Sequence, residues 1–208
     1  MIKYMRKKEM KKKGENALIL KFHDDYIPGT KLKKSDMDNL TGLEFLRKVF
    51  FISDGVMLTQ IRDISGIDSS TLQNWTKRGW VVNSKLKKYD IDQVAHILII
   101  NMLRSCMQLD KIAFLIHYIN GKVGDASDDI ISDSILYDYI CRILQNMMDT
   151  SCSLSSVHTA VEAVTADYTE PVPGARDRLN HALEVIVVTY YAALIKQHAT
   201  GLLEKLEG

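Results

Sequence analysis

The segment at residues 69–78, SSTLQNWTKR, carries the side chains that a DNA-reading helix needs at its exposed edge. Base edges in the major groove are read by hydrogen bonds at close approach, which favours small or polar residues such as Ser69, Gln73 and Asn74. Glutamine and asparagine amides can each make two hydrogen bonds to adenine. Lys77 lies one turn beyond them, where a cation can contact a phosphate. The pattern predicts a helix that reads bases in double-stranded DNA.

A basic stretch follows this helix directly. Residues 80–82 and 85–89 are predicted to form two short strands around an Asn-Ser pair, which suits a tight turn. Alternation along KLKKY would place Lys85 and Lys87 on one face, opposite Leu86 and Lys88. Such a hairpin could lie along a phosphate backbone as a wing. The alternative interpretation is a solvated surface hairpin.

Helical spacing of apolar residues and local capping signals predict the elements that hold these side chains. Asp68 can cap the DNA-reading helix, in which Leu72 and Trp75 would face inward. A glycine ends the short helix before it, and two helices joined in this way make a helix-turn-helix pattern. The predicted helices are 35–52, beginning at Ser35; 60–65, between Thr59 and Gly66; 69–78, ended by Gly79; 90–107, opened by Asp90 and Gln93; 109–120; a long helix from Ser127 through Met148; 154–167; and 174–206.

These elements predict a mainly α fold with a helical C-terminal region. The long helix that begins near residue 127 has an apolar stripe wide enough to need cover from two neighbours, and the last helix is apolar nearly all round at its centre. Burial on that scale suits a helical bundle or a dimer interface. We expect a flexible basic tail over 1–19, a helix-turn-helix unit with an N-terminal helix over 20–121, and an all-helical domain over 122–208.

Charge is distributed unevenly along the 208 residues. The net charge is +1, but residues 1–120 carry +8 and residues 121–208 carry −7. A basic half joined to an acidic half suggests a polyanion-binding module beside a domain with another task. Residues 1–15 supply +5 of that positive charge, so the ordered basic module is only modestly charged.

Cysteines and apolar runs indicate the compartment. Three cysteines, with no CxxC pair and no signal-peptide run, fit reduced thiols in a cytoplasmic protein. The longest apolar runs, 94–103 and 185–195, fall short of the roughly 20 residues that span a bilayer. We therefore expect no membrane segment, no disulfide and no cysteine-based metal site.

Enzyme motifs are not evident in the sequence. We find no phosphate-binding glycine loop, nucleophile elbow or HExxH motif, and the pair His181 and Glu184 is a single HxxE. His96 and His117 lie beside aliphatic residues on predicted helices, where a buried imidazole with satisfied hydrogen bonds is the expected role. The sequence favours a protein that is not an enzyme and needs no cofactor.

The central region resembles a known superfamily. The stretch LTQIRDISGIDSSTLQNWTKRGWV followed by KLKKYDIDQVAHILIINMLRSCMQLDKIAFLI is similar to the winged helix-turn-helix of the MerR superfamily. More narrowly, residues 20–150 resemble the YkrK-like family of Gram-positive bacteria, a family of unknown function. The superfamily positions that match are Gly66, Thr71, Leu72, Gly79, Tyr89, Val94, Leu103, Leu109, Ile112 and Leu115.

The resemblance implies a MerR-like winged helix-turn-helix whose DNA-facing positions fall on Ser70, Thr71, Gln73, Asn74 and Lys87. The superfamily commonly has arginine at the first and third of these positions and tyrosine at the fourth. Loss of two cations should weaken phosphate anchoring and flatten the salt dependence of binding. The full set of candidate DNA-binding residues is Ser69, Ser70, Thr71, Gln73, Asn74, Lys77, Arg78, Lys85, Lys87 and Lys88.

Together these patterns favour a DNA-binding transcriptional regulator, most simply a repressor. It would read a pseudo-palindromic site as a homodimer, and its acidic helical region would supply dimerisation and could hold a pocket for a small-molecule effector. The rival is a non-enzymatic protein-protein adaptor, in which a degenerate winged helix and the C-terminal bundle are binding surfaces.

Overall fold

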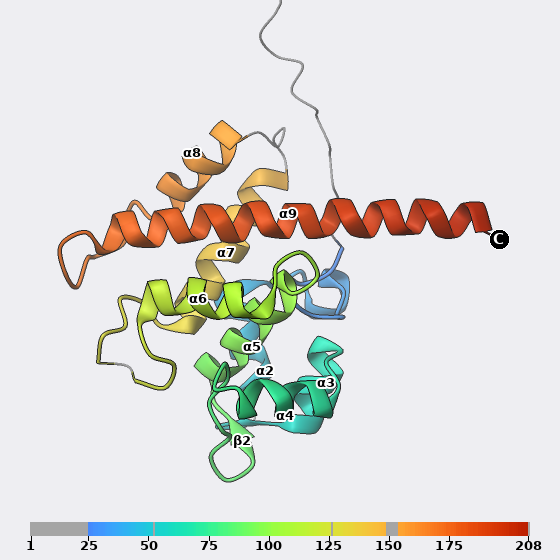
Figure 1. The fold of residues 1–208 in the computed structure, drawn as a ribbon, viewed down its shortest axis with the longest axis horizontal. Helices are drawn as coiled ribbons and strands as arrows, with labels where there is room; N and C mark the ends of the chain where they lie inside the picture. The colour runs from blue at the N-terminus through green and yellow to red at the C-terminus, as the bar shows by residue number, and fades with distance from the viewer. Residues whose placement is uncertain (1–24, 52, 126, 149–153, 208) are drawn as a thin grey trace, which may run out of the picture.

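The computed structural model describes residues 25–51, 53–125, 127–148 and 154–207. These residues form eight α-helices, one short 3-10 helix and one two-stranded antiparallel sheet (Figure 1). The chain is therefore mainly helical, as predicted; the expected basic tail at 1–19 lies outside the described residues. The elements are η1 Lys34–Met37, α2 Gly42–Val49, β1 Val56–Met57, α3 Leu58–Ser65, α4 Ser69–Lys77, β2 Lys88–Tyr89, α5 Ile91–Leu103, α6 Leu109–Asn120, α7 Asp133–Met148, α8 Leu154–Val164 and α9 Ala175–Glu207.

Helix α5 lies at the centre of the fold. All residues from Val94 to Ile100 are buried, because α5 packs against α2, α3, α6, α7 and α9 on different sides. Asp90 and Gln93 form the predicted capping box, in which each backbone N–H donates to the other side chain, at 3.0 and 2.9 Å. One continuous core extends from Ile27 through α5 to Tyr191 on α9.

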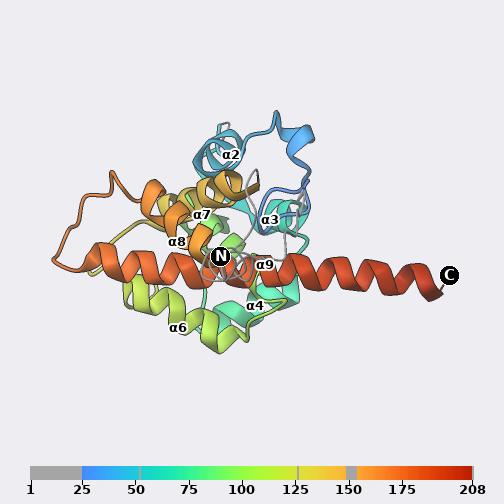
Figure 2. The same cartoon turned by 90° about the horizontal axis from the view of Figure 1, so that it is seen from above.

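Helix α9 runs the length of the molecule. Figures 1 and 2 show it lying across the other helices at its N-terminal half and extending beyond them at its C-terminal half. Its buried residues end at Tyr191, in the middle of the helix. Among the described residues, we find no helix with the length and apolar content required to cross a bilayer.

The predicted helix at 35–52 is wrong in its first half. The chain forms the short η1 helix and then leaves helical geometry at Asp38 and Asn39, whose φ angles are 55° and 61°. Ser35 caps no helix there, since its hydroxyl contacts Asp36. The α2 helix begins only at Gly42, where the carboxylate of Asp138 on α7 accepts a hydrogen bond from the Leu43 N–H at 2.8 Å.

The predicted cap at Ser127 is also wrong. The Ser127 hydroxyl donates to Asp125 at 2.6 Å within a loop, and α7 begins six residues later, at Asp133. The first turn of α7 is instead capped by Asp92 of α5, whose carboxylate accepts from the Ser134 N–H at 2.8 Å. Among the other predicted helices, the bounds of α6 are confirmed at 109–120, and α9 occupies 175–207 against 174–206 predicted. Helix α5 stops at residue 103 instead of 107, and α8 stops at residue 164 instead of 167. Helix α3 starts at residue 58 instead of 60.

Candidate nucleic-acid interface

Helices α3 and α4 are joined by a short turn. Gly66 ends α3 in the left-handed region, with φ 74°, and Asp68 caps α4 as predicted. Leu72 and Trp75 are both buried, which confirms that this side of α4 faces the core. The opposite side of α4 is therefore fixed toward solvent.

The N-terminus of α4 is organised by the Asp68 carboxylate. It accepts hydrogen bonds from the Thr71 N–H at 2.8 Å, the Thr71 hydroxyl at 2.7 Å and the Ser70 hydroxyl. The hydrogen bonds from Ser70 and then from Thr71 hold the pKa of Asp68 well below its usual range. The hydroxyls of Ser70 and Thr71 thus serve the helix cap, and a negative charge lies at the end of α4.

The exposed edge of α4 presents Gln73, Asn74 and Lys77. Within the part of the chain that the structure describes, the side chains of Gln73 and Lys77 form no hydrogen bond or ion pair. Asn74 is less free, because its Oδ1 accepts from Arg78 Nε at 3.4 Å, and the Arg78 guanidinium stacks 5.1 Å from the Trp80 ring centroid. Gln73 and Lys77 are therefore the side chains of this edge that are available to a ligand.

The predicted hairpin around Asn83-Ser84 is wrong. The chain reverses at Leu86 and Lys87, which have φ angles of 51° and 64°, while Lys85 and Lys88 exchange two backbone hydrogen bonds of 2.9 Å. Positive φ at both central residues is the geometry of a type I′ turn. We call residues Lys85–Lys88 the lysine turn.

The second strand pairs with a different partner from the one predicted. Residues 80–82 form no strand, and β2 instead pairs with β1, which directly precedes α3, with Tyr89 opposite Val56. The predicted alternation of Lys85 and Lys87 opposite Leu86 does not hold, because two of those residues are the turn itself. The sheet fixes the base of the lysine turn to the start of α3.

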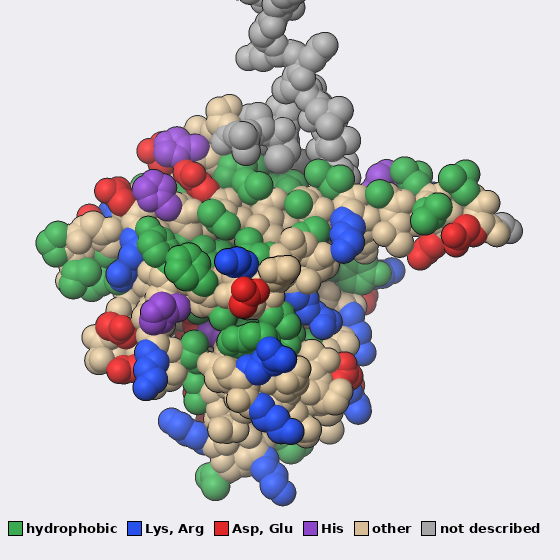
Figure 3. Space-filling view, viewed as in Figure 1, with side chains coloured by type: hydrophobic (Ala, Val, Ile, Leu, Met, Phe, Trp, Pro, Cys, Tyr) green, Lys and Arg blue, Asp and Glu red, His purple; other side chains and the backbone are tan. Residues whose placement is uncertain are grey.

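The lysine turn and α4 together make a basic surface. Residues 69–88 contain five basic residues, Lys77, Arg78, Lys85, Lys87 and Lys88, and no acidic residue. All five are exposed, and Leu86 at the tip is 97% exposed. Figure 3 shows lysine and arginine side chains gathered over the part of the molecule that contains α3, α4 and the lysine turn. This is the surface that a polyanion would contact.

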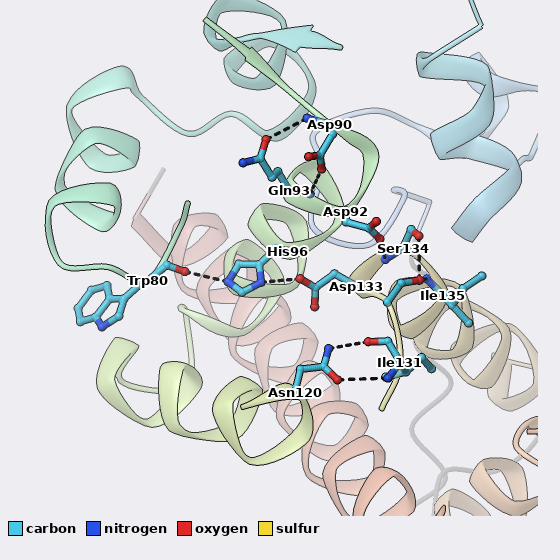
Figure 4. A network of polar contacts seen from close by, with 11 residues as sticks. Trp80, Asp90, Asp92, Gln93, His96, Asn120, Ile131, Asp133, Ser134 and Ile135 are labelled. Carbon is cyan, nitrogen blue, oxygen red and sulfur yellow. Dashed lines mark hydrogen bonds and ion pairs between the residues drawn. The ribbon is translucent and has the colours of Figure 1, made fainter. Parts of the chain in front are cut away.

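His96 connects this basic part to the C-terminal helices (Figure 4). Its Nε2 lies 2.8 Å from the carbonyl oxygen of Trp80, just after α4, and its Nδ1 lies 2.9 Å from Asp133 Oδ2 at the start of α7. Burial lowers the pKa of His96, but the hydrogen bond and charge of Asp133 and the Trp80 carbonyl outweigh it, so the pKa lies above its ordinary value. The prediction of a buried histidine with satisfied hydrogen bonds is confirmed at His96; His117 is exposed, and its Nδ1 lies 2.6 Å from the Gly121 carbonyl oxygen.

A hollow of about 380 Å³ lies beside His96 and is lined by residues of α5, the lysine turn and the loop before α7. Burial, followed by the charges of Asp133 and neighbouring carboxylates, raises the pKa of Asp129 in this hollow to about 6. Among the described residues, no three histidine, cysteine or acidic side chains are grouped to hold a metal ion. Cys106 is exposed and Cys141 is buried, and burial raises the pKa of the Cys141 thiol to about 12.

Comparison with known proteins shows a domain without an assigned function. The family model described as "Domain of unknown function (DUF1836)" matches residues 45–140. The Bacillus subtilis (strain 168) protein named "Uncharacterized protein YkrK" is 29% identical over 93 residues, which cover 43% of this chain and 40% of that protein. This chain thus spans less than half the length of the relative, and no solved structure matches it. The matched residues run from α2 into α7 and include α4, the lysine turn and the His96–Asp133 pair.

Proposed function

We propose that this protein is a DNA-binding transcriptional regulator that reads a pseudo-palindromic site as a homodimer. The observation that carries the proposal is the exposed edge of α4, where Gln73 and Lys77 are accessible, together with the adjacent lysine turn. The arrangement supports a winged helix-turn-helix of MerR type. In it, α3 and α4 are the helix pair, and the lysine turn that leads into β2 is the wing.

The contacts divide by chemistry. Gln73 has the amide that can bond to adenine in the major groove, and Lys77 lies one turn further along, toward a phosphate. Lys85, Lys87 and Lys88 would neutralise phosphates on the flanking backbone. Trp75 holds α4 against the core, so the edge keeps its orientation on binding.

Band-shift titration over a series of salt concentrations tests the proposal. A binding site is first selected from fragments of the source genome, and two half-sites are expected about one helical turn, or roughly 34 Å, apart or a multiple of that. Wild-type protein should show a negative slope of several units in a plot of log affinity against log salt. Lys87→Ala should reduce the slope by about one, whereas Gln73→Ala should chiefly relax base preference at one position of each half-site.

Lys111→Ala is the matched control, because Lys111 is an exposed lysine on α6, outside the basic surface. Its slope and site preference should equal those of the wild type. If wild type and both variants bind DNA equally poorly near physiological salt, DNA regulation is refuted and the adaptor function takes its place.

A further inference from the structure

Helix α9 carries an apolar seam with coiled-coil spacing. Seven apolar residues follow one another at alternating intervals of three and four positions, which is the a and d pattern of a heptad repeat. The two preceding positions of the same pattern hold the polar residues Arg178 and His181. The apolar seam therefore begins at Val185. The seam residues are Val185, Val188, Ala192, Ile195, Ala199, Leu202 and Leu206.

The seam faces solvent along its whole length. The exposed fractions are 44% for Val185, 41% for Val188, 45% for Ile195, 50% for Leu202 and 84% for Leu206, and both alanines are exposed. The core side of the same helix carries Leu183, Ile186, Val187 and Tyr190, all buried. Helix α9 therefore has two apolar faces, and the described residues of this chain cover one of them.

The projecting half of α9 has little to stabilise it within one chain. Beyond Tyr191 no residue of the helix is buried, and Lys196 Nζ donates to the Ser105 carbonyl oxygen at 2.8 Å. Residues 192–207 are only slightly longer than the roughly 12–15 residues below which an isolated helix is marginal in water, and Gly201 lowers helix propensity by about 1 kcal/mol relative to alanine. A helix of this length is expected when a partner packs along it.

We propose that the seam binds α9 of a second copy of this chain as an antiparallel coiled coil. In this register Val185 packs against Leu202 of the second copy, Val188 against Ala199, and Ala192 against Ile195, so each a position meets a d position. The seam spans about 32 Å at a rise of 1.5 Å per residue. The projecting end of each copy then lies along the exposed valines of the other.

Charge favours the antiparallel direction. The flanking g positions are Glu184, Tyr191, His198 and Lys205. Glu184 Oε1 lies 2.6 Å from His158 Nδ1 of its own chain, and antiparallel pairing brings the same carboxylate beside Lys205 of the second copy, twice in the dimer. Parallel pairing would instead place g positions beside Thr189, Lys196 and Leu203, which creates no pair of opposite charges.

Sedimentation velocity on the full chain tests the interface independently of DNA binding. Wild type should be a dimer. Leu202→Asp and Ile195→Asp should each raise the dimer dissociation constant about 100-fold, because each buries charged groups in the seam, at its outermost Val185–Leu202 layer and at its central Ala192–Ile195 layer respectively. Gln197→Asp, which adds the same charge to α9 outside the a, d, e and g positions, is the matched control and should remain a dimer. Unchanged tryptophan fluorescence checks that each variant keeps its fold.

A charge exchange tests the direction. Glu184→Lys and Lys205→Glu should each weaken the dimer, and the double variant should recover its affinity if the helices are antiparallel. A double variant weaker than both single variants would overturn the antiparallel register. A monomeric wild type would overturn the interface, even if another segment of the chain protects the α9 amides from hydrogen exchange. A Leu202→Asp variant that dimerises normally would also overturn it.

Discussion

His96 is held between two hydrogen-bond acceptors. A carbonyl oxygen and a carboxylate can only accept, so a neutral imidazole, with one N–H, cannot donate to both the Trp80 carbonyl and an ionised Asp133. The pair therefore holds an extra proton, which explains why the pKa of His96 lies above its ordinary value despite burial. Protonation of this one residue links the chain after α4 to the start of α7.

Stability should depend on pH through His96. A histidine whose pKa is raised by folding contributes stability that is fully present below its unfolded pKa, about 6.5, and is lost as pH rises through the folded value. We expect His96→Gln to lower the free energy of unfolding by about 1.5–3 kcal/mol at pH 6, the range for a hydrogen bond to a charged group. The difference should shrink toward pH 9. Urea titrations at both pH values measure it, and an equal loss at the two values would contradict the proton assignment.

At the scale of elements, local capping signals predict some helix starts correctly and fail at others, as at Ser35 and Ser127. Asp68 and the Asp90–Gln93 capping box lie next to the helices they start, so sequence predicted α4 and the start of α5. The carboxylates that cap α2 and α7 come from residues 95 and 42 positions away, and the local contribution at α7 is a 3.4 Å hydrogen bond from the Ile135 N–H to the Ser132 hydroxyl.

The candidate site shows the same division. The accessible edge at Gln73 follows from helical spacing and was predicted, as was the inward position of Trp75. The predicted position of the turn is wrong because Leu86 and Lys87 adopt positive φ without the glycine or asparagine that usually signals such a turn. The pairing of His96 with Asp133 is a tertiary contact across 37 positions, which no local pattern predicts. The local hint of a helix start at α7 is the Asp133-Ser134 pair before an apolar run.

The cap of α4 makes a prediction that rests on the proposed function. Asparagine caps a helix as well as aspartate does, so Asp68→Asn should keep α4 intact while it removes a negative charge close to the phosphates. We expect DNA affinity to rise about threefold to tenfold at low salt, in the range of one charge-phosphate interaction. Asp68→Ala should lower stability by about 1 kcal/mol through loss of the cap. Band shifts and urea titration separate the two effects, and weaker DNA binding by Asp68→Asn would show that Asp68 itself contacts the nucleic acid.

At the scale of the whole molecule, the C-terminal helices complete the N-terminal fold. Helix α7 packs on both α2 and α5, and its Tyr137 hydroxyl donates to the Pro28 carbonyl oxygen at 2.7 Å. Asp138 caps α2, and a Cβ atom at Gly42 would lie 2.4 Å from its carboxylate, so the two helices fit without room for a side chain. The charge asymmetry between the halves of the sequence therefore does not divide the hydrophobic core.

A shared core predicts that both halves unfold together. Trp75 and Trp80, the two tryptophans of the chain, lie in or just after α4, so fluorescence reports on the basic part, whereas far-UV circular dichroism is weighted toward the long α7 and α9 helices. Leu136 on α7 is fully buried. Leu136→Ala should lower the free energy of unfolding by about 3 kcal/mol, and the urea midpoints from the two probes should fall by the same amount.

Phe114→Ala, which removes an exposed side chain on α6, is the control and should change the free energy of unfolding by less than about 0.5 kcal/mol, so that both midpoints stay close to the wild-type values. A fluorescence midpoint that stays at the wild-type value while the dichroism midpoint falls would mean that the α4 region folds without α7. In that case the His96–Asp133 pair would join two independent units. Coincident midpoints would instead mean that a change at the C-terminal helices, including dimerisation through α9, acts on the stability of the same folded unit that presents Gln73.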